Sequence, residues 1–438
     1  MGRYGDWFRG QSGRRLRYGQ QYFKGLFYHC RSNIERMEEQ TPDASYDTLH
    51  HFISESTWDG LGVIGQVARE VQATLAALPG EQGLLLDECG WAKAGSQSVG
   101  VGRQYIGALG KTDNGQVGVF AALVRGTHAG LVGARLYLPM AWCTDAARCR
   151  QARIPLADQA YQSKTEQATA LVEQLLGSGS VTADWVGGDA LYGGSPGLRR
   201  ALQARGQAYV LDLQPTLQVY TTDPTPLVGR VWSGRGRRPQ RRLPVGVAQP
   251  IQAVVAAAGA SDTWPVYAHR RGTKGPLRRR ALLVPVWLWQ ADEQTAQAVE
   301  LLVSSELDGS EVKYSLCYTP PGAPALTVLT ALRRQMQRYW VERTFQEAKQ
   351  QLGLHQAQTR SWPAWYHHVA LTLMAMHFML EAQLEGDPEI PYLSFASIKL
   401  LLARKLRNKL DQADALQAAI IKRTKYLQRP DQRRNAPT

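Results

Sequence analysis

The stretch "GLLLDECGWAKAGSQSVGVGRQYIGALGKTDNGQVGVFAALVRG", residues 83–126, decides the fold. It begins with a short apolar run that ends in two acids, "GLLLDEC" (83–89), which predicts a buried strand. Two more strands are predicted at 103–111 and 115–126, and "KTDNGQ" has the composition of a hairpin turn between them. Three consecutive strands joined by short connections favour an antiparallel sheet.

The pattern changes to alternating helices and strands after this sheet. A loop through 138–155 leads to a predicted helix (164–179), a strand ending in "WVGGDALYG" (185–193), a helix (197–206) and the strand "AYVLDL" (208–213). Three antiparallel strands followed by helix, strand, helix, strand is the order of a ribonuclease H-like mixed sheet. The predicted fold class is therefore α/β.

The flanking regions have different compositions. A helical region precedes the sheet, a stretch rich in Pro, Gly, Arg and β-branched residues follows it, and long helices and a basic end close the chain. The predicted boundaries are a helical domain (1–80), the first part of the α/β domain (81–216), a β-rich insertion (217–322), its closing helices (323–385) and a helical basic C-terminal region (386–438).

The net charge indicates the class of partner. The 438 residues include 51 Lys and Arg against 37 Asp and Glu, a formal charge of +14, which favours a polyanion. The longest apolar run has 12 residues, too short to span a bilayer, and no signal peptide is evident, so we expect no membrane association and an intracellular location. The five cysteines include no CxxC pair, which predicts reduced thiols rather than disulfides or a zinc finger.

Three acids are positioned to act together. Asp87 and Asp189 each end a predicted strand at the carboxyl edge of the sheet, and Glu342 lies on a predicted helix at 326–353. Clustered carboxylates are the ligands that Mg²⁺ prefers, and two such ions can activate the attacking oxygen and stabilise the leaving oxygen in phosphoryl transfer. Taken singly, Asp87 could cap a strand and Asp189 could form a turn.

Several separated segments resemble one known family, the DDE-class transposases of bacterial insertion sequences. The similar segments are residues 84–120, "RLYLPMAWCTDAARCRQARIP", "VGGDALYGGSPGLRRALQARGQAYVLDL", "RRGTKG" and "RYWVERTFQEAKQQLG" (338–353). The resemblance implies a ribonuclease H-like catalytic domain with a β-rich insertion before the last acid, and a DNA-binding helical domain at the N-terminus. It also implies that Asp87, Asp189 and Glu342 bind two Mg²⁺ ions, for which Mn²⁺ substitutes.

The last family motif distinguishes Glu342 from Glu347. The motif runs Tyr, two residues, Arg, three residues, Glu, six residues, Lys, and here Arg338, Glu342 and Lys349 match it while Gln335 stands at the Tyr position. On a helix, the three matching positions fall within about 60° of one another. Glu347 lies on another face and is better explained as a partner of Arg343 four residues earlier.

The resemblance implies DNA cleavage and joining. The enzyme would cut transposon ends and direct the freed 3′-hydroxyl at target DNA, in some relatives through a hairpin in which an aromatic from the insertion stacks on a flipped base. Double-stranded DNA is then the partner, with a homodimer expected on DNA, in the bacterial cytoplasm with the nucleoid. The predicted DNA-binding residues are Arg338, Lys349, Arg235, Arg237, Arg238, Arg271, Lys274, Trp264, Trp287 and Trp289. Alternation places both Trp287 and Trp289 on one strand face, which is more typical of a core.

Other functions remain open to different degrees. "GGSPG" (193–197) matches the pattern around a hydrolase serine, but Pro196 lacks the N–H that an oxyanion hole needs. Glu88 points to the opposite strand face from Asp87 and is a weaker metal candidate. The remaining alternatives are a transposase-derived DNA-binding protein without cleavage and a ribonuclease H-fold nuclease without strand transfer.

Overall fold

The computed structural model describes residues 2–8, 14–28, 33–41, 43–226, 242–272, 275–386 and 394–407. Four residues predicted to bind DNA lie outside the described residues: Arg235, Arg237, Arg238 and Lys274. Cys30 also lies outside them, and within the described part of the chain the other four cysteines are free thiols.

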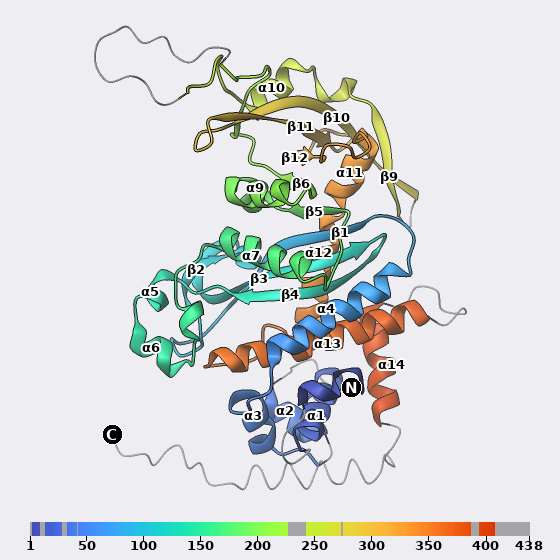
Figure 1. Ribbon diagram of the computed structural model, residues 1–438. Helices are drawn as coiled ribbons and strands as arrows, with labels where there is room; N and C mark the ends of the chain where they lie inside the picture. The colour runs from blue at the N-terminus through green and yellow to red at the C-terminus, as the bar shows by residue number, and fades with distance from the viewer. Residues whose placement is uncertain are drawn as a thin grey trace.

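One mixed sheet organises the chain (Figure 1). Its strand order is β2-β3-β1-β5-β6-β12-β11-β10-β9. Strand β4 pairs with β3 on the edge opposite β1. Strand β1 is antiparallel to β3 and parallel to β5, which is parallel to β6. The order β4-β3-β1-β5-β6 is that of a ribonuclease H-like sheet, so the predicted fold class is confirmed. These five strands are Gln82–Ala92 (β1), Lys111–Arg125 (β3), His128–Leu136 (β4), Trp185–Gly188 (β5) and Ala208–Asp212 (β6).

The first strands differ from the prediction in two ways. The segment "KTDNGQ" is the start of β3, and the turn before it is made by a short 3-10 helix, Gly107–Leu109, and by Gly110 at φ 63°. The strand before that turn, β2 (Gly102–Ile106), only extends the sheet edge beside β3. The third antiparallel strand is β4, which the sequence analysis missed because the glycines in "HAGLVGARL" weaken its strand pattern.

Helices cover both faces of this sheet. Leu171 of α7 lies nearest to Gly133 of β4, whereas Val71 of α4 and Leu380 of α13 lie nearest to Gly130 on the other face. Helix α12 packs beside α13 against β1, β3 and β4. The helices concerned are α4 (Gly60–Ala76), α7 (Lys164–Gly177), α9 (Pro196–Ala204), α12 (Arg338–Leu352) and α13 (Trp362–Glu385). No helix among the described ranges is both long and apolar enough to cross a bilayer.

The N-terminal helices pack on α13 rather than standing apart (Figure 1). They are η1 (Gly2–Phe8), α1 (Arg14–Tyr28), α2 (Ile34–Gln40) and α3 (Tyr46–Ser54), and α14 (Phe395–Arg407) contacts α1 and α13. The hydroxyl of Tyr22 on α1 lies 2.9 Å from Nδ1 of His368 on α13, and both side chains are buried. One hydrophobic core therefore runs from these helices into the sheet.

The β-rich segment continues the same sheet. Strand β12 (Val312–Tyr318) pairs antiparallel with β6, followed outward by β11 (Thr295–Ser305), β10 (Gly275–Gln290) and β9 (Val266–Gly272). Helix α10 (Ile251–Ala257) and the short pair β7 (Gln218–Val219) and β8 (Gln249–Pro250) accompany them. The helix predicted over 326–353 is divided at Gln337 into α11 (Val328–Met336) and α12. A shared sheet makes the insertion a direct extension of the strands that carry the site.

Candidate active site

Three aspartates form one row where the parallel pairing of β1, β5 and β6 ends. Asp87 was predicted to end its strand but lies in the middle of β1, because β1 continues to Ala92 beside β3. Leu86 pairs with Gly188, which pairs with Leu211, so the next position on each strand is an aspartate: Asp87, Asp189 and Asp212. The sequence analysis singled out the first two and missed Asp212. Its signal was present, because "YVLD" ends in the same way as "LLLD", with apolar residues before an acid.

Burial makes Asp87 difficult to ionise. Its side chain is partly buried, and Oδ1 accepts a hydrogen bond from the backbone N–H of Glu88 over 2.8 Å. The pKa of Asp87 is raised to about 7, mainly by loss of hydration; the charge of Arg338 lowers it in part and the charge of Asp189 adds to the rise. Asp87 is therefore only partly ionised at neutral pH, even with the positive charge of Arg338 nearby.

Asp189 lies in the row of aspartates and also caps a short helix. It caps the four-residue helix α8 (Ala190–Gly193), because Oδ1 accepts from the backbone N–H groups of Leu191 (2.9 Å) and Tyr192 (3.4 Å). The helix is pressed onto β6: a Cβ on Gly193 would lie 1.9 Å from the carbonyl oxygen of Asp212, so only glycine fits there. Burial is the main cause that raises the pKa of Asp189.

Arg338 joins this row to Glu342. Its Nη1 donates to Oδ2 of Asp212 over 2.5 Å, and its Nη2 donates to Oε1 of Glu342 over 3.1 Å. Its charge also opposes the rise in the pKa of Asp87 and of Asp189, and these acids raise the pKa of the guanidinium in return. Arg338 thus pairs directly with Asp212 and Glu342 and acts on Asp87 and Asp189 only through its charge, and the Glu342 side chain is 61% exposed.

The donor chemistry of this site suits a hard divalent cation. Among the described residues no three His, Cys, Asp or Glu side chains are close enough together to hold a metal ion, and Arg338 lies among the acids instead. However, every candidate ligand is a carboxylate, which is the type of ligand that Mg²⁺ prefers. The binding of Mg²⁺ by Asp87, Asp189 and Glu342 together therefore stays a prediction.

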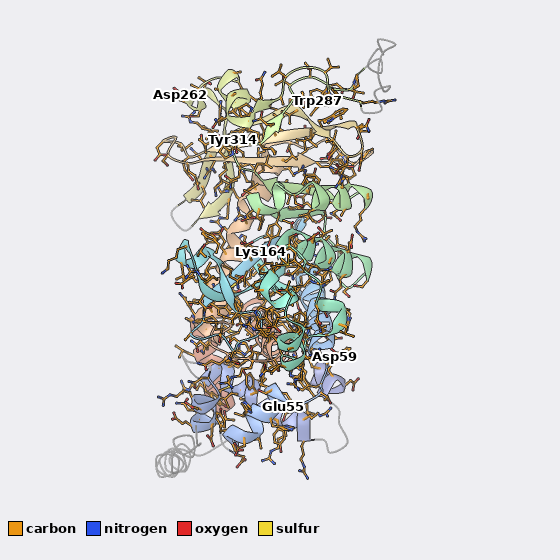
Figure 2. The ribbon with its side chains drawn as sticks, turned by 90° about the vertical axis from the view of Figure 1, so that its left-hand side faces the viewer. Glu55, Asp59, Lys164, Asp262, Trp287 and Tyr314 are labelled. Atoms are coloured by element: carbon orange, nitrogen blue, oxygen red, sulfur yellow. The ribbon has the colours of Figure 1, made fainter. Side chains whose placement is uncertain are left out.

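Glu88 is engaged by other partners. Its Oε1 accepts from Nζ of Lys164 over 2.9 Å, and its Oε2 accepts from the hydroxyl of Tyr192 over 3.3 Å. Lys164 begins α7 and lies at mid-height of the molecule, between Trp287 in the insertion and Glu55 near the N-terminal helices (Figure 2). The ion pair ties α7 to the strand that carries Asp87.

Lys349 and Glu347 of α12 lie in different surroundings, as the helix geometry indicates. Nζ of Lys349 donates to the backbone carbonyl of Gly90 over 3.1 Å, further along β1 than Asp87. Glu347 accepts from Nε of Arg343 over 2.7 Å, and its side chain is only 13% exposed. The expected ion pair between Arg343 and Glu347 is therefore present.

A cavity of about 300 Å³ opens beside Arg338 and Glu342, between α12 and the insertion. The guanidinium of Arg270 lies over the rings of Tyr339 and Trp340, 4.8 and 5.2 Å from their centroids. The ionisable residues that line the cavity are His269, Arg270, Arg278, Arg279, Glu306, Glu311, Lys313, Arg338 and Glu342. Arg271, which follows Arg270 and is predicted from the sequence to bind DNA, is exposed on β9 and does not line the cavity.

The three candidate tryptophans lie within the fold of the insertion. Trp264 is 4% exposed, and its indole N–H donates to the carbonyl of Gly259 over 3.3 Å. Trp287 and Trp289 are half-buried on β10, and the backbone of Trp287 pairs with that of Tyr220. Stacking of Trp264 on a base would therefore require its removal from a buried position.

Two further features do not belong to the acidic site. Ser195 caps α9, because Oγ accepts from the backbone N–H of Leu198 over 3.3 Å, which is a structural role. A larger cavity, about 1290 Å³, lies between the N-terminal helices and α6 (Ala146–Gln151). Its lining includes Glu35, Asp145 and Arg360 and none of the acids of the row.

A ribonuclease H-like sheet with carboxylates at the ends of its central strands, and an arginine and a glutamate on the helix that packs over them, defines a class of nucleic-acid-processing enzymes. The chain belongs to the DDE superfamily endonuclease family, whose model matches residues 13–276. The resemblance to DDE-class insertion-sequence transposases is thereby confirmed.

Individual relatives are consistent with this family. A curated relative, "Probable transposase for insertion sequence element IS701" from Microchaete diplosiphon, is 33% identical over 179 residues, which cover 40% of this chain and 43% of that protein. The match thus spans less than half of the relative. Two solved structures are similar at low level: a piggyBac transposase synaptic complex with hairpin DNA (12% identity, 98% of this chain and 75% of the other, TM-score 0.43) and the NurA nuclease of Sulfolobus solfataricus (9%, 80% and 94%, TM-score 0.25).

Proposed function

We propose that this chain is a DNA transposase that cuts the ends of its element and joins the freed 3′-hydroxyl to target DNA. The observation that supports the proposal is the row of Asp87, Asp189 and Asp212, with Arg338 bridging Asp212 and Glu342, in a member of this family. When bound, two Mg²⁺ or Mn²⁺ ions would activate the attacking oxygen and stabilise the leaving oxygen.

The protein residues would position the DNA. Asp87 and Asp189 each accept a backbone hydrogen bond at Oδ1, which fixes the orientation of the carboxylate. Arg338 would hold a phosphate beside them, because its planar guanidinium matches two phosphate oxygens, and Lys349 would contact a phosphate nearby. The acids disfavour a phosphate unless cations are present, which couples DNA binding to metal binding.

The cavity beside Glu342 supports an approach path for the DNA strand. Arg270, Arg278 and Lys313 line it together with Arg338, and positive side chains along a groove attract the sugar-phosphate backbone. Double-stranded DNA is thus the proposed partner, with two chains acting on two ends. The remaining predicted contacts, at Arg271 and the three tryptophans, stay predictions, as does a hairpin intermediate. A cellular location with the bacterial nucleoid would follow from this partner.

A cleavage and joining assay tests the proposal. Labelled DNA that contains both boundaries of the genetic element carrying this gene would be incubated with the protein and Mg²⁺ or Mn²⁺, together with an unlabelled target plasmid. We expect nicks at the boundaries and labelled target, and denaturing gels would reveal any hairpin. Binding without nicking would favour a DNA-binding protein, and nicking without labelled target would favour a nuclease that lacks strand transfer.

A further inference from the structure

We propose that Asp212 is a positioning residue for Arg338 and that a buried hydrogen-bond chain from the insertion holds it in place. The inference rests on the proposed function, because it concerns the arginine that would bind the reacting phosphate. The chain runs through Ser304, Gln335 and Ser315 to Asp212. It connects two insertion strands and α11 to the end of β6.

The hydrogen bonds are short and point in one direction. Oγ of Ser304 donates to Oε1 of Gln335 over 2.6 Å, Nε2 of Gln335 donates to Oγ of Ser315 over 2.7 Å, and Oγ of Ser315 donates to Oδ1 of Asp212 over 2.6 Å. Arg338 approaches Oδ2 of the same carboxylate from the opposite side. Asp212, which as a carboxylate only accepts hydrogen bonds, is the point at which both sets of donors meet.

Burial gives this chain its stiffness. Ser304 and Ser315 are 0% exposed and Gln335 is 3% exposed, so water does not compete for these groups. A missing partner would leave a buried polar atom unsatisfied, which makes alternative side-chain positions costly. The carboxylate of Asp212 is therefore held at one position, and the guanidinium that it accepts from is directed toward Asp87 and Asp189.

Hydrogen bonding also separates Asp212 from the proposed metal ligands. Both of its oxygens are occupied, one by Ser315 and one by Arg338. The arrangement further gives a role to Gln335, which stands where the family motif has tyrosine: here the residue is buried and takes part in the hydrogen-bond chain. The insertion thus helps to orient the active-site arginine.

A double-mutant cycle tests the inference. We would measure kcat and KM for nicking of boundary DNA by wild type, Asp212→Asn, Arg338→Ala and the double variant. Loss of a charge-assisted hydrogen bond predicts a fall in kcat of about 10- to 100-fold for Asp212→Asn, with KM changed less than about twofold. In the Arg338→Ala background the same substitution should change kcat less than about twofold, because Asp212 acts through Arg338.

Two further variants distinguish a loss of positioning from misfolding. Ser315→Ala removes a single buried hydroxyl and should lower kcat less than Asp212→Asn does. Asp184→Asn is the matched control, because this aspartate accepts from the backbone N–H of Gln82 at the other end of the strands and should leave kcat unchanged. Independent losses in the double variant, or no loss from Asp212→Asn, would overturn the inference.

Crystal structures of Asp212→Asn and Ser315→Ala supply a readout that needs no activity. We expect the Arg338 guanidinium to be displaced or disordered in Asp212→Asn, whereas an unchanged position would contradict the positioning role. If wild type does not cut DNA at all, the proposed function fails, and these structures still decide whether Asp212 holds Arg338.

Discussion

Arg338 and Glu342 lie one turn apart on α12, and Nη2 of the arginine donates to Oε1 of the glutamate over 3.1 Å. A second pair of the same spacing, Arg343 and Glu347, forms on another face of the helix over 2.7 Å. Only the first pair also interacts with the aspartates, because Arg338 reaches Asp212 on β6. The same local sequence motif therefore has two different surroundings.

The first prediction follows from this difference. Glu342→Gln should abolish nicking of boundary DNA, with a fall of at least about 10²-fold, because a neutral amide cannot supply the charge that a divalent ion needs. Glu347→Gln removes the matched acid of the other pair and should retain activity within about threefold, since Glu347 pairs with Arg343 on another face of the helix. Gel assays of end cleavage measure both. The reverse result would transfer the catalytic role to Glu347.

The second prediction concerns metal binding without DNA. Mg²⁺ or Mn²⁺ binds the native acids and not the unfolded chain, so it should raise the unfolding temperature, by an amount equivalent to about 2.7 kcal/mol at 100 times Kd. The shift should disappear in the Asp87→Asn, Asp189→Asn double variant and persist in Glu347→Gln. Differential scanning calorimetry with and without EDTA checks this, and a wild type that does not respond to either ion would argue against a metal site here.

The third prediction uses the raised pKa of Asp87. Its pKa is about 7 in the folded protein against an ordinary 3.8, so the folded state binds this proton more tightly than the unfolded state does. The contribution of this residue to the free energy of unfolding should therefore decrease as pH rises from about 4 to about 7 and stay constant above that. Asp87→Asn should stabilise the metal-free protein at pH 8, by roughly 2 to 4 kcal/mol.

Denaturation by urea at pH 5 and pH 8 in EDTA measures this effect. The difference in free energy of unfolding between Asp87→Asn and wild type should be larger at pH 8 than at pH 5. Asp184→Asn serves as the control for replacement of a strand-end aspartate. Equal differences at the two pH values would show that Asp87 ionises normally in the folded protein.

The sequence predicts the parts of this site that depend on local pattern. An apolar strand that ends in an acid identifies Asp87 and Asp189, and helix periodicity separates Glu342 from Glu347. Asp212 required knowledge of register, because only the pairing of Leu211 with Gly188 shows that it shares a row with the other two. Register depends on long-range strand pairing, which a local pattern does not fix.

Two other features of the fold are not evident from the sequence, because they also depend on long-range contacts. The strand β4 contains two glycines, Gly130 and Gly133, whose weak strand preference is offset by packing of helices against both of its faces. The β-rich segment is predicted from the sequence as an insertion at 217–322, but the pairing of its last strand, β12, with β6, which brings Ser315 beside Asp212, is not evident from local pattern. Tertiary contacts of this kind decide which polar residues meet.

The last prediction concerns the positive side of the cavity beside Glu342. Arg270 and Arg278 line this cavity from the insertion, and each contact of an arginine with a phosphate adds close to one unit to the slope of log K against log salt. Arg270→Ala and Arg278→Ala should each weaken binding of boundary DNA about 3- to 10-fold near 0.1 M salt and reduce that slope by about one. Fluorescence anisotropy in EDTA measures the affinity without cleavage.

Two arginines outside the cavity complete this experiment. Arg343 is 42% exposed and pairs with Glu347, so Arg343→Ala should leave both the affinity and the salt slope nearly unchanged. Arg271 follows Arg270 on β9 but is exposed away from the cavity lining, and it was predicted from the sequence to bind DNA. If Arg271→Ala reduces the slope and Arg270→Ala does not, the DNA strand passes over the exposed face of β9 rather than through the cavity. Alternate side chains on one strand point to opposite faces, so the two neighbouring substitutions distinguish these paths.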